Sequence, residues 1–222
     1  MKPYTVTILL ALLLATLIAS LGDSSVSLTA EGGLVESLTV WLYAILIVFL
    51  VFRARVRETL NRILCPIVVL LLMCRELDFD KKFTEMGIFK SKFYKSAEVP
   101  IVEKIVAVVV IVAILVIAGM LLRRNWKWLV LGVRQRLRSE SGIAVALLLA
   151  GFSKLVLDGL PRKLEKLGLG ANEFLRAHHE TFEEVLELAI PVSLLLAAWY
   201  LWRRPEEDSQ VPATADEGVG RN

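Results

Sequence analysis

The sequence predicts an all-α fold, a polytopic membrane helix bundle of about six transmembrane helices, from its hydrophobicity and the grouping of its apolar residues. Hydrophobic residues make up 56% of the 222 residues, and the mean hydropathy is +0.62. The apolar residues form blocks of membrane length, without the two-residue alternation of barrel strands. Because lipid offers the backbone no hydrogen-bond partners, we expect these blocks to be helical.

Six apolar blocks follow one another along residues 1–204, which we expect to form one transmembrane bundle. The blocks are residues 4–21, 38–52, 63–74, 101–122, 142–157 and 183–202. The first block has a second interpretation as a signal peptide that begins after Lys2 and is cleaved near Ser20. Its length favours an uncleaved helix. Residues 205–222 are polar and without periodicity, so we expect a disordered cytoplasmic tail.

Arginine residues predict the orientation of the bundle. They cluster after the second, fourth and sixth blocks: Arg53, Arg55, Arg57 and Arg62, then Arg123, Arg124, Arg134, Arg136 and Arg138, then Arg203 and Arg204. If these loops are cytoplasmic, both termini are cytoplasmic as well. The opposite loops hold several lysines, which makes the asymmetry small. The net charge of +3 is too low to indicate nucleic acid as a partner, so the expected partner is the lipid bilayer.

Acidic side chains enter several blocks at a similar depth near the outer leaflet. Glu187 is the clearest case, because it lies about one helical turn inside the last block. A carboxylate at that depth costs several kcal/mol unless it is paired, protonated or faces a polar cavity. Counting from the arginine clusters places four further acids in the same outer third: Glu36, Glu76, Asp80 and Asp158. The coincidence predicts a shared polar site.

The spacing of these residues predicts a metal site. At about 100° per residue, His179, Glu183 and Glu187 share one helix face, and a cation would let several carboxylates stay ionised together. Carboxylate and imidazole ligands suit Zn, Fe or Mn. The expected ligands or acid–base groups are Glu76, Asp80, His179, Glu183 and Glu187, with Asp158 and Glu36 orienting them.

Three functions fit such a site. The first is a metal-dependent intramembrane hydrolase or lipid-modifying enzyme, whose metal-bound water attacks an ester or amide of a lipid substrate, although no His-Glu-x-x-His pair is present. The second is a cation- or proton-coupled transporter, although the inner thirds of the blocks are almost purely apolar. The third is a non-catalytic assembly or accessory subunit whose acids join helices.

Each candidate residue also has a purely structural interpretation. Glu187 can pair with Lys154 or Arg75, and Glu76 and Asp80 can pair with Lys81 or Lys82. The acids before Glu187 suit a solvated first helical turn, His179 suits an interfacial position, and Asp158 suits a helix-ending turn before Gly159. The segment 79–104 mixes aromatic residues with lysines, which is typical of a lid over the site or of an anchor belt.

Short acidic motifs at the block ends carry a resemblance to a known group of proteins. The motifs are Glu31-Gly32-Gly33-Leu34-Val35-Glu36, Arg75-Glu76-Leu77-Asp78-Phe79-Asp80, Lys154-Leu155-Val156-Leu157-Asp158 and Glu183-Glu184-Val185-Leu186-Glu187. The chain resembles small, functionally uncharacterised multi-pass inner-membrane proteins of bacteria. The resemblance implies a bacterial inner membrane and no particular activity. A more distant likeness to membrane hydrolases such as alkaline ceramidases lacks their paired histidines.

Overall fold

The computed structural model describes residues 2–20, 33–53, 59–82, 84, 87–89, 91–170 and 172–204. Every regular element within these ranges is helical, which confirms the all-α prediction. The elements are α1 (Lys2–Ala19), α3 (Leu34–Phe52), α4 (Thr59–Glu76), η1 (Phe79–Lys82), α5 (Ser91–Lys95), α6 (Ile101–Arg134), α7 (Arg138–Phe152), η2 (Ser153–Leu157), α8 (Leu160–Lys166) and α9 (Glu173–Arg203). The predicted tail, residues 205–222, lies outside the described residues.

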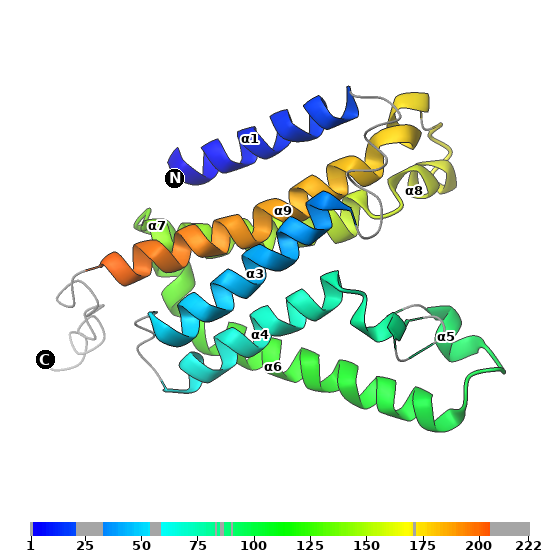
Figure 1. Cartoon of the computed structure of the whole chain (residues 1–222), viewed down its shortest axis with the longest axis horizontal. Coiled ribbons are helices and arrows are strands. Elements are labelled where there is room, and N and C mark those ends of the chain that lie inside the picture. The colour runs from blue at the N-terminus through cyan, green and yellow to red at the C-terminus, as the bar shows by residue number, and fades with distance from the viewer. Residues whose placement is uncertain are drawn as a thin grey trace, which may run out of the picture.

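The last helix, α9, is the centre of the bundle (Figure 1). It packs along α7, α1 and α3, while α4 lies between α3 and α6. Its start is fixed by Asn172, whose side-chain oxygen accepts a hydrogen bond from the Leu175 amide at 2.9 Å, as an N-cap residue does. The apolar core follows α9 and includes Tyr43, Leu46 and Val185, each 1% exposed. The helix that carries Glu187 is therefore the most enclosed helix of the protein.

Four helical segments are long and apolar enough to cross a membrane: Leu34–Phe52, Ile101–Arg134, Arg138–Leu157 and Glu173–Arg203. The remaining two predicted spans correspond to α1, whose apolar part is shorter, and to α4, which carries Arg62, Arg75 and Glu76. A helical membrane bundle is therefore supported, with four of the six predicted spans meeting the length and hydropathy that a crossing requires.

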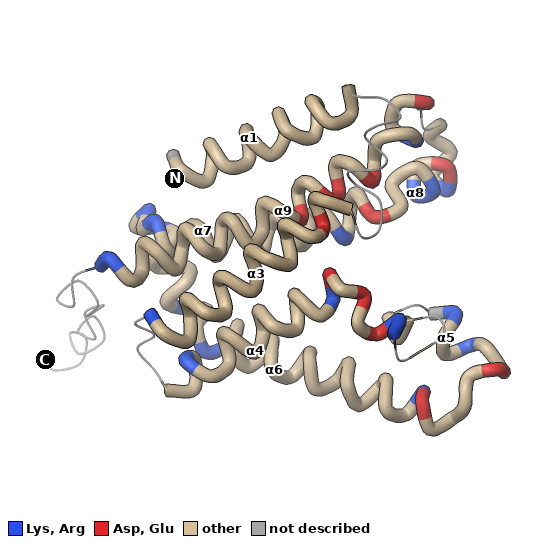
Figure 2. Tube along the Cα trace, in the orientation of Figure 1, with Lys and Arg blue, Asp and Glu red and all other residues tan. Residues whose placement is uncertain are grey.

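Charged residues divide the bundle into two ends (Figure 2). Lysine and arginine mark the end where α3 and α9 finish and α4 and α7 begin, and α1 begins toward the same end (Figures 1 and 2). Acidic residues gather at the opposite end, along the first half of α9 and at the start of α3. Below, the first end is called the arginine end and the second the acidic end.

The longest helix, α6, lies at the edge of the bundle (Figure 1). It contacts α7 through the turn that joins them and α4 along its side. Two amides fix the second contact, because Asn61 donates to Asn125 at 2.9 Å and Asn125 donates back at 3.2 Å. Most of its apolar side chains are exposed, among them Ile101, Val109 and Leu115. Such a surface suits a helix surrounded by acyl chains.

The described residues between Phe79 and Pro100 form a small cap with its own core, here called the outer cap, between α4 and α6. Phe93 is fully buried there against Val99 and Ala107, and the Tyr94 hydroxyl donates to the Ile88 carbonyl oxygen at 2.8 Å. The side chain of Asp80 closes the same loop by accepting from the Ile88 amide at 2.9 Å. The core of the cap therefore rests on the first turns of α6.

A buried acid–base chain as the candidate functional site

Glu187 is the junction of the site. Its side chain is 4% exposed, and one carboxylate oxygen, Oε1, meets three donors. The Arg75 guanidinium lies at 3.2 Å, the Ser153 hydroxyl at 2.8 Å and the Lys154 ammonium at 2.7 Å. Arg75 comes from α4, and the other two come from η2. Both ion pairs that the sequence allowed for Glu187 are thus formed, and they join three elements at one oxygen.

The two bases extend the contact into a chain of alternating charge. Lys154 also binds Glu183 Oε1 at 2.7 Å, and Arg75 binds Glu76 Oε1 through Nη1 at 3.3 Å. The order is Glu183, Lys154, Glu187, Arg75 and Glu76, and we call these five residues the acid–base chain. Glu76 is as buried as Glu187, with 5% of its side chain exposed. Each base therefore lies between two carboxylates and binds both of them.

A local change of helix type brings α7 to Glu187. The α-helix ends at Phe152, and residues Ser153–Leu157 continue it as a π-helix. One extra residue per turn shifts the side-chain directions, and such turns are frequent at functional sites. Here the consecutive residues Ser153 and Lys154 both contact the same carboxylate oxygen. The turn ends at Gly159, whose φ of +62° is left-handed.

Pro191 interrupts the backbone hydrogen bonding of α9 beside the site. It lies inside the helix and is buried. Because proline has no N–H, the carbonyl four residues earlier, that of Glu187, receives no helical hydrogen bond from it. The carbonyl oxygen of Glu187 therefore lacks its usual α-helical donor, one turn inward from the carboxylate of the same residue.

Among the residues that the structure describes, carboxylates outnumber bases around the acid–base chain. Glu184, next to Glu183 on α9, is partly buried and lies within electrostatic range of Glu187, Glu76 and Glu36. No hydrogen bond or ion pair of Glu184 is found among the described residues. Buried charge without a counter-charge is costly in lipid, so the site favours an additional positive charge.

Glu36 lies within electrostatic range of Glu76, whereas Asp80, His179 and Asp158 make contacts outside the chain. Asp80 binds the backbone of the outer cap. His179 makes a hydrogen-bond contact between Nδ1 and the Arg176 carbonyl oxygen at 3.1 Å. Asp158 is exposed at the end of the π-helical turn, where its amide bonds the Ser153 carbonyl oxygen at 2.9 Å, in agreement with the turn interpretation. The structure thus joins Glu76, Glu183 and Glu187 but not the full predicted ligand set.

Metal-ligand geometry is not found in the described part of the chain. No three histidine, cysteine, aspartate or glutamate side chains there lie together in a way that could hold a metal ion. The reason is visible in the acid–base chain, because Lys154 and Arg75 occupy the space between the carboxylates. The described residues therefore lend no support to the Zn, Fe or Mn site that the sequence predicted.

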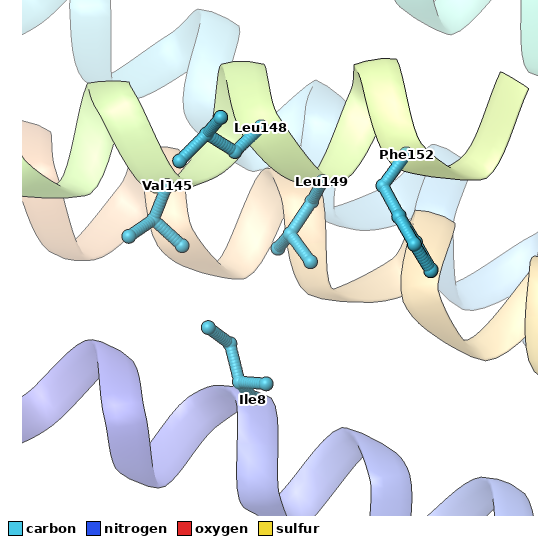
Figure 3. Close-up of a pocket in the computed structure, with 5 residues that line it drawn as sticks. All are labelled: Ile8, Val145, Leu148, Leu149 and Phe152. Atoms are coloured by element: carbon cyan, nitrogen blue, oxygen red, sulfur yellow. The ribbon is translucent and has the colours of Figure 1, made fainter. Parts of the chain in front are cut away.

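A crevice of about 300 Å³ lies between α1 and α7, away from the charged residues (Figure 3). Ile8 points from α1 toward Val145, Leu149 and Phe152 of α7 (Figure 3). The lining is apolar. An apolar wall suits acyl chains and offers no group for acid–base chemistry, so this crevice is separate from the candidate site.

A second buried charge network lies at the arginine end and was missed by the sequence analysis. Glu140, in the first turn of α7, is fully buried. Arg204 binds both of its carboxylate oxygens at 3.0 Å and donates to Ser139 Oγ at 3.0 Å. In the sequence, Glu140 follows a run of arginines and looks like an ordinary loop acid. The preceding Ser139 and the nearby Gly132 were the only signals of close packing.

Comparison with known protein families, curated proteins and solved structures finds no match to this chain.

Proposed function

We propose that the chain is a six-span protein of a bacterial inner membrane, with both termini in the cytoplasm, and that its acid–base chain binds protons or cations that cross the membrane. The observation that carries this proposal is the excess of carboxylates. Two bases, Lys154 and Arg75, face three carboxylates in direct contact, with Glu184 nearby. Ionisable side chains in this position typically mark ion or proton pathways.

Alternation of charge gives the site a way to respond to a bound cation. Lys154 bridges Glu183 and Glu187, and Arg75 bridges Glu187 and Glu76. When a proton or cation neutralises one carboxylate, the base beside it keeps its second partner. The base can then move toward that partner without losing all compensation, which lowers the energetic cost of the change.

Exposure supports access from the acidic end. The side chains of Arg75 and Lys154 are 36% and 38% exposed, whereas that of Glu187 is 4% exposed. Exposed bases are unfavourable against acyl chains, so they are expected to reach the polar outer interface. A cation from that side meets the partly buried Glu183 and Glu184 before it meets Glu187.

Proton flux into liposomes tests this proposal. The purified full-length protein is reconstituted with a pH-sensitive dye inside, and an inward pH gradient is imposed with a potassium ionophore to balance charge. We expect Glu187→Gln to lower the flux by at least about tenfold, or roughly 1.4 kcal/mol of barrier. The matched control is Glu165→Gln, because Glu165 forms an exposed ion pair with Arg176.

Flux through the wild-type protein that equals the leak of empty liposomes contradicts proton transport. The same assay with Na⁺ or K⁺ gradients and matching fluorescent indicators covers the cation form of the proposal. Equal flux through the wild type and Glu187→Gln with every ion removes the role of the acid–base chain.

A structural role is the second candidate function. It is favoured because Glu187 Oε1 already contacts three donors of the protein itself. Three donors on one oxygen tie α4 and η2 to α9, as expected of polar contacts that hold an accessory subunit together. Thermal unfolding in detergent separates the two functions. If the role is structural, Glu187→Gln lowers the midpoint temperature of unfolding, and the wild-type protein shows no ion flux in liposomes.

A further inference from the structure

We propose that Glu140 is the inner proton acceptor of the pathway and that Arg204 gates it, an inference that rests on the proton form of the proposed function. A pathway that begins at Glu187 needs a second titratable group near the opposite membrane border. Seventeen residues of α9 separate Glu187 from Arg204, which is about 26 Å at 1.5 Å per residue. The hydrocarbon core is about 30 Å thick, so the two networks lie near its two borders.

Glu140 is buried although it lies in the first turn of α7, close to exposed residues. It lies one turn from the exposed arginines of the α6–α7 connection, yet its side chain is 0% exposed. Gly132 of α6 makes room for it, since a Cβ there would lie 2.3 Å from Glu140 Cγ. Burial of a carboxylate has a desolvation cost that an exposed acid at the same turn would avoid. The fold therefore encloses this acid closely.

The groups that face Glu140 come from every helix packed around it. Arg204 of α9 binds it directly, and Ser139 of α7 donates to it. Tyr4 of α1 lies within electrostatic range of Glu140, Arg138 and Tyr200. Arg204 is the counter-charge of the Glu140 carboxylate in the structure.

Two buried hydroxyl groups without a hydrogen-bond partner among the described residues are available to a relay: Ser193, between Glu187 and Arg204 on α9, and Tyr4 of α1, beside Glu140. Ser193 is 0% exposed and Tyr4 is 1% exposed, and neither hydroxyl has a hydrogen-bond partner among the described residues. Tyr4 packs against Gly142, two residues beyond Glu140. A hydroxyl both donates and accepts, so it can pass a proton along a hydrogen-bonded line. About 9 Å of helix separate Glu187 from Ser193, and about 10 Å separate Ser193 from Tyr200, which lies within electrostatic range of Tyr4. Bound water has to bridge both intervals.

The proposed step moves one proton and no electrons. A proton that leaves the Glu187 carboxyl is relayed through water, Ser193 and Tyr4 to a Glu140 oxygen. An O–H bond forms on Glu140, and its ion pair with Arg204 breaks. Arg204 turns toward the aqueous side, Glu140 releases the proton to cytoplasmic water, and the ion pair forms again.

Three variants in the reconstituted full chain test the proposal. Glu140→Gln removes the acceptor but keeps the shape, and we expect the flux to fall at least about tenfold. Glu140→Asp keeps a carboxylate and is expected to retain most of the flux. Arg204→Ala removes the gate and is expected to leave the flux equal to or above that of the wild type. The exposed control is again Glu165→Gln.

The outcomes separate this inference from the proposed function. Flux that Glu187→Gln abolishes and Glu140→Gln leaves unchanged overturns the role of Glu140 alone. A wild type without proton flux overturns both. Parallel losses of flux and thermal stability in Glu140→Gln and Arg204→Ala identify a structural latch and also overturn the inference. Should Glu140→Gln fail to fold, Ser193→Ala replaces it, and flux equal to the wild type in that variant counts against the relay.

Discussion

Lys154 and Glu187 meet at 2.7 Å where the helix that carries Lys154 is wound as a π-helix. The same turn aims the preceding residue, Ser153, at the same oxygen. An α-helix directs consecutive side chains about 100° apart. The π-helical turn is therefore the local feature on which the connection of α7 to the acid–base chain depends.

Lys154→Met should destabilise the protein. It leaves Glu183 and Glu187 without the base that they share, and an unsatisfied buried group costs about 1–3 kcal/mol. The measurement is chemical unfolding in detergent micelles. Arg176→Ala is the control, because its exposed ion pair with Glu165 should contribute less than about 1 kcal/mol. Equal effects of the two substitutions would contradict the importance of the chain.

Gly142→Ala should be destabilising, whereas Gly151→Ala in the same helix should be neutral. A Cβ at Gly142 would lie 2.4 Å from the Tyr4 hydroxyl oxygen, while nothing lies within 4 Å of one at Gly151. Overpacking of this kind typically costs about 1–3 kcal/mol. The free energies of unfolding of the two variants give the comparison. Adding Tyr4→Ala to Gly142→Ala should relieve the steric part of the cost.

The amide pair between α4 and α6 should show strong coupling in a double-mutant cycle. Asn61→Leu or Asn125→Leu alone removes one partner of two hydrogen bonds, and the remaining amide is left less well satisfied at a cost of about 1–3 kcal/mol. Replacing both asparagines should cost less than the sum of the single changes. Additive changes in unfolding free energy would show that the pair does not hold α6.

Metal content checks the hydrolase hypothesis directly. Elemental analysis of the purified protein should find well under one equivalent of Zn, Fe or Mn, because Arg75 and Lys154 separate the carboxylates of the site. A stoichiometric metal that disappears in Glu187→Ala would restore the enzyme interpretation. Glu165→Ala provides the matched comparison at an exposed position.

The sequence predicted the helices better than their contacts. Apolar block length is a local property, so the helix containing Glu187 and the arginine that ends it could be placed directly. The ion pairs of Glu187 with Lys154 and Arg75 were among the expected alternatives, since few other partners exist at that depth. Arg75 reaches Glu187 from α4, while Lys154 reaches it from the π-helical turn that begins at Ser153, for which the sequence has no clear signal.

The sequence analysis misjudged two residues, Asp80 and Glu140, for different physical reasons. Asp80 was grouped with Glu76 because four residues separate them on one helix face, but α4 ends at Glu76 and the chain turns into the outer cap. Glu140 was overlooked because an acid among arginines is usual in a cytoplasmic loop. Its burial depends on Gly132 and Arg204, which are close to it only in the folded bundle.

The unequal lengths of the two flanking helices have a consequence for the surrounding bilayer. On one flank α1 has 18 residues, and on the other α6 has 34 (Figure 1), or about 27 Å and 51 Å at 1.5 Å per residue. The apolar part of α6 ends before Arg123 and Arg124, and the hydrocarbon core is only about 30 Å thick. The last turns of α6, with Arg123, Arg124 and Arg134, are therefore expected to continue past the acyl chains into the headgroup region at the arginine end, where α1 has no counterpart.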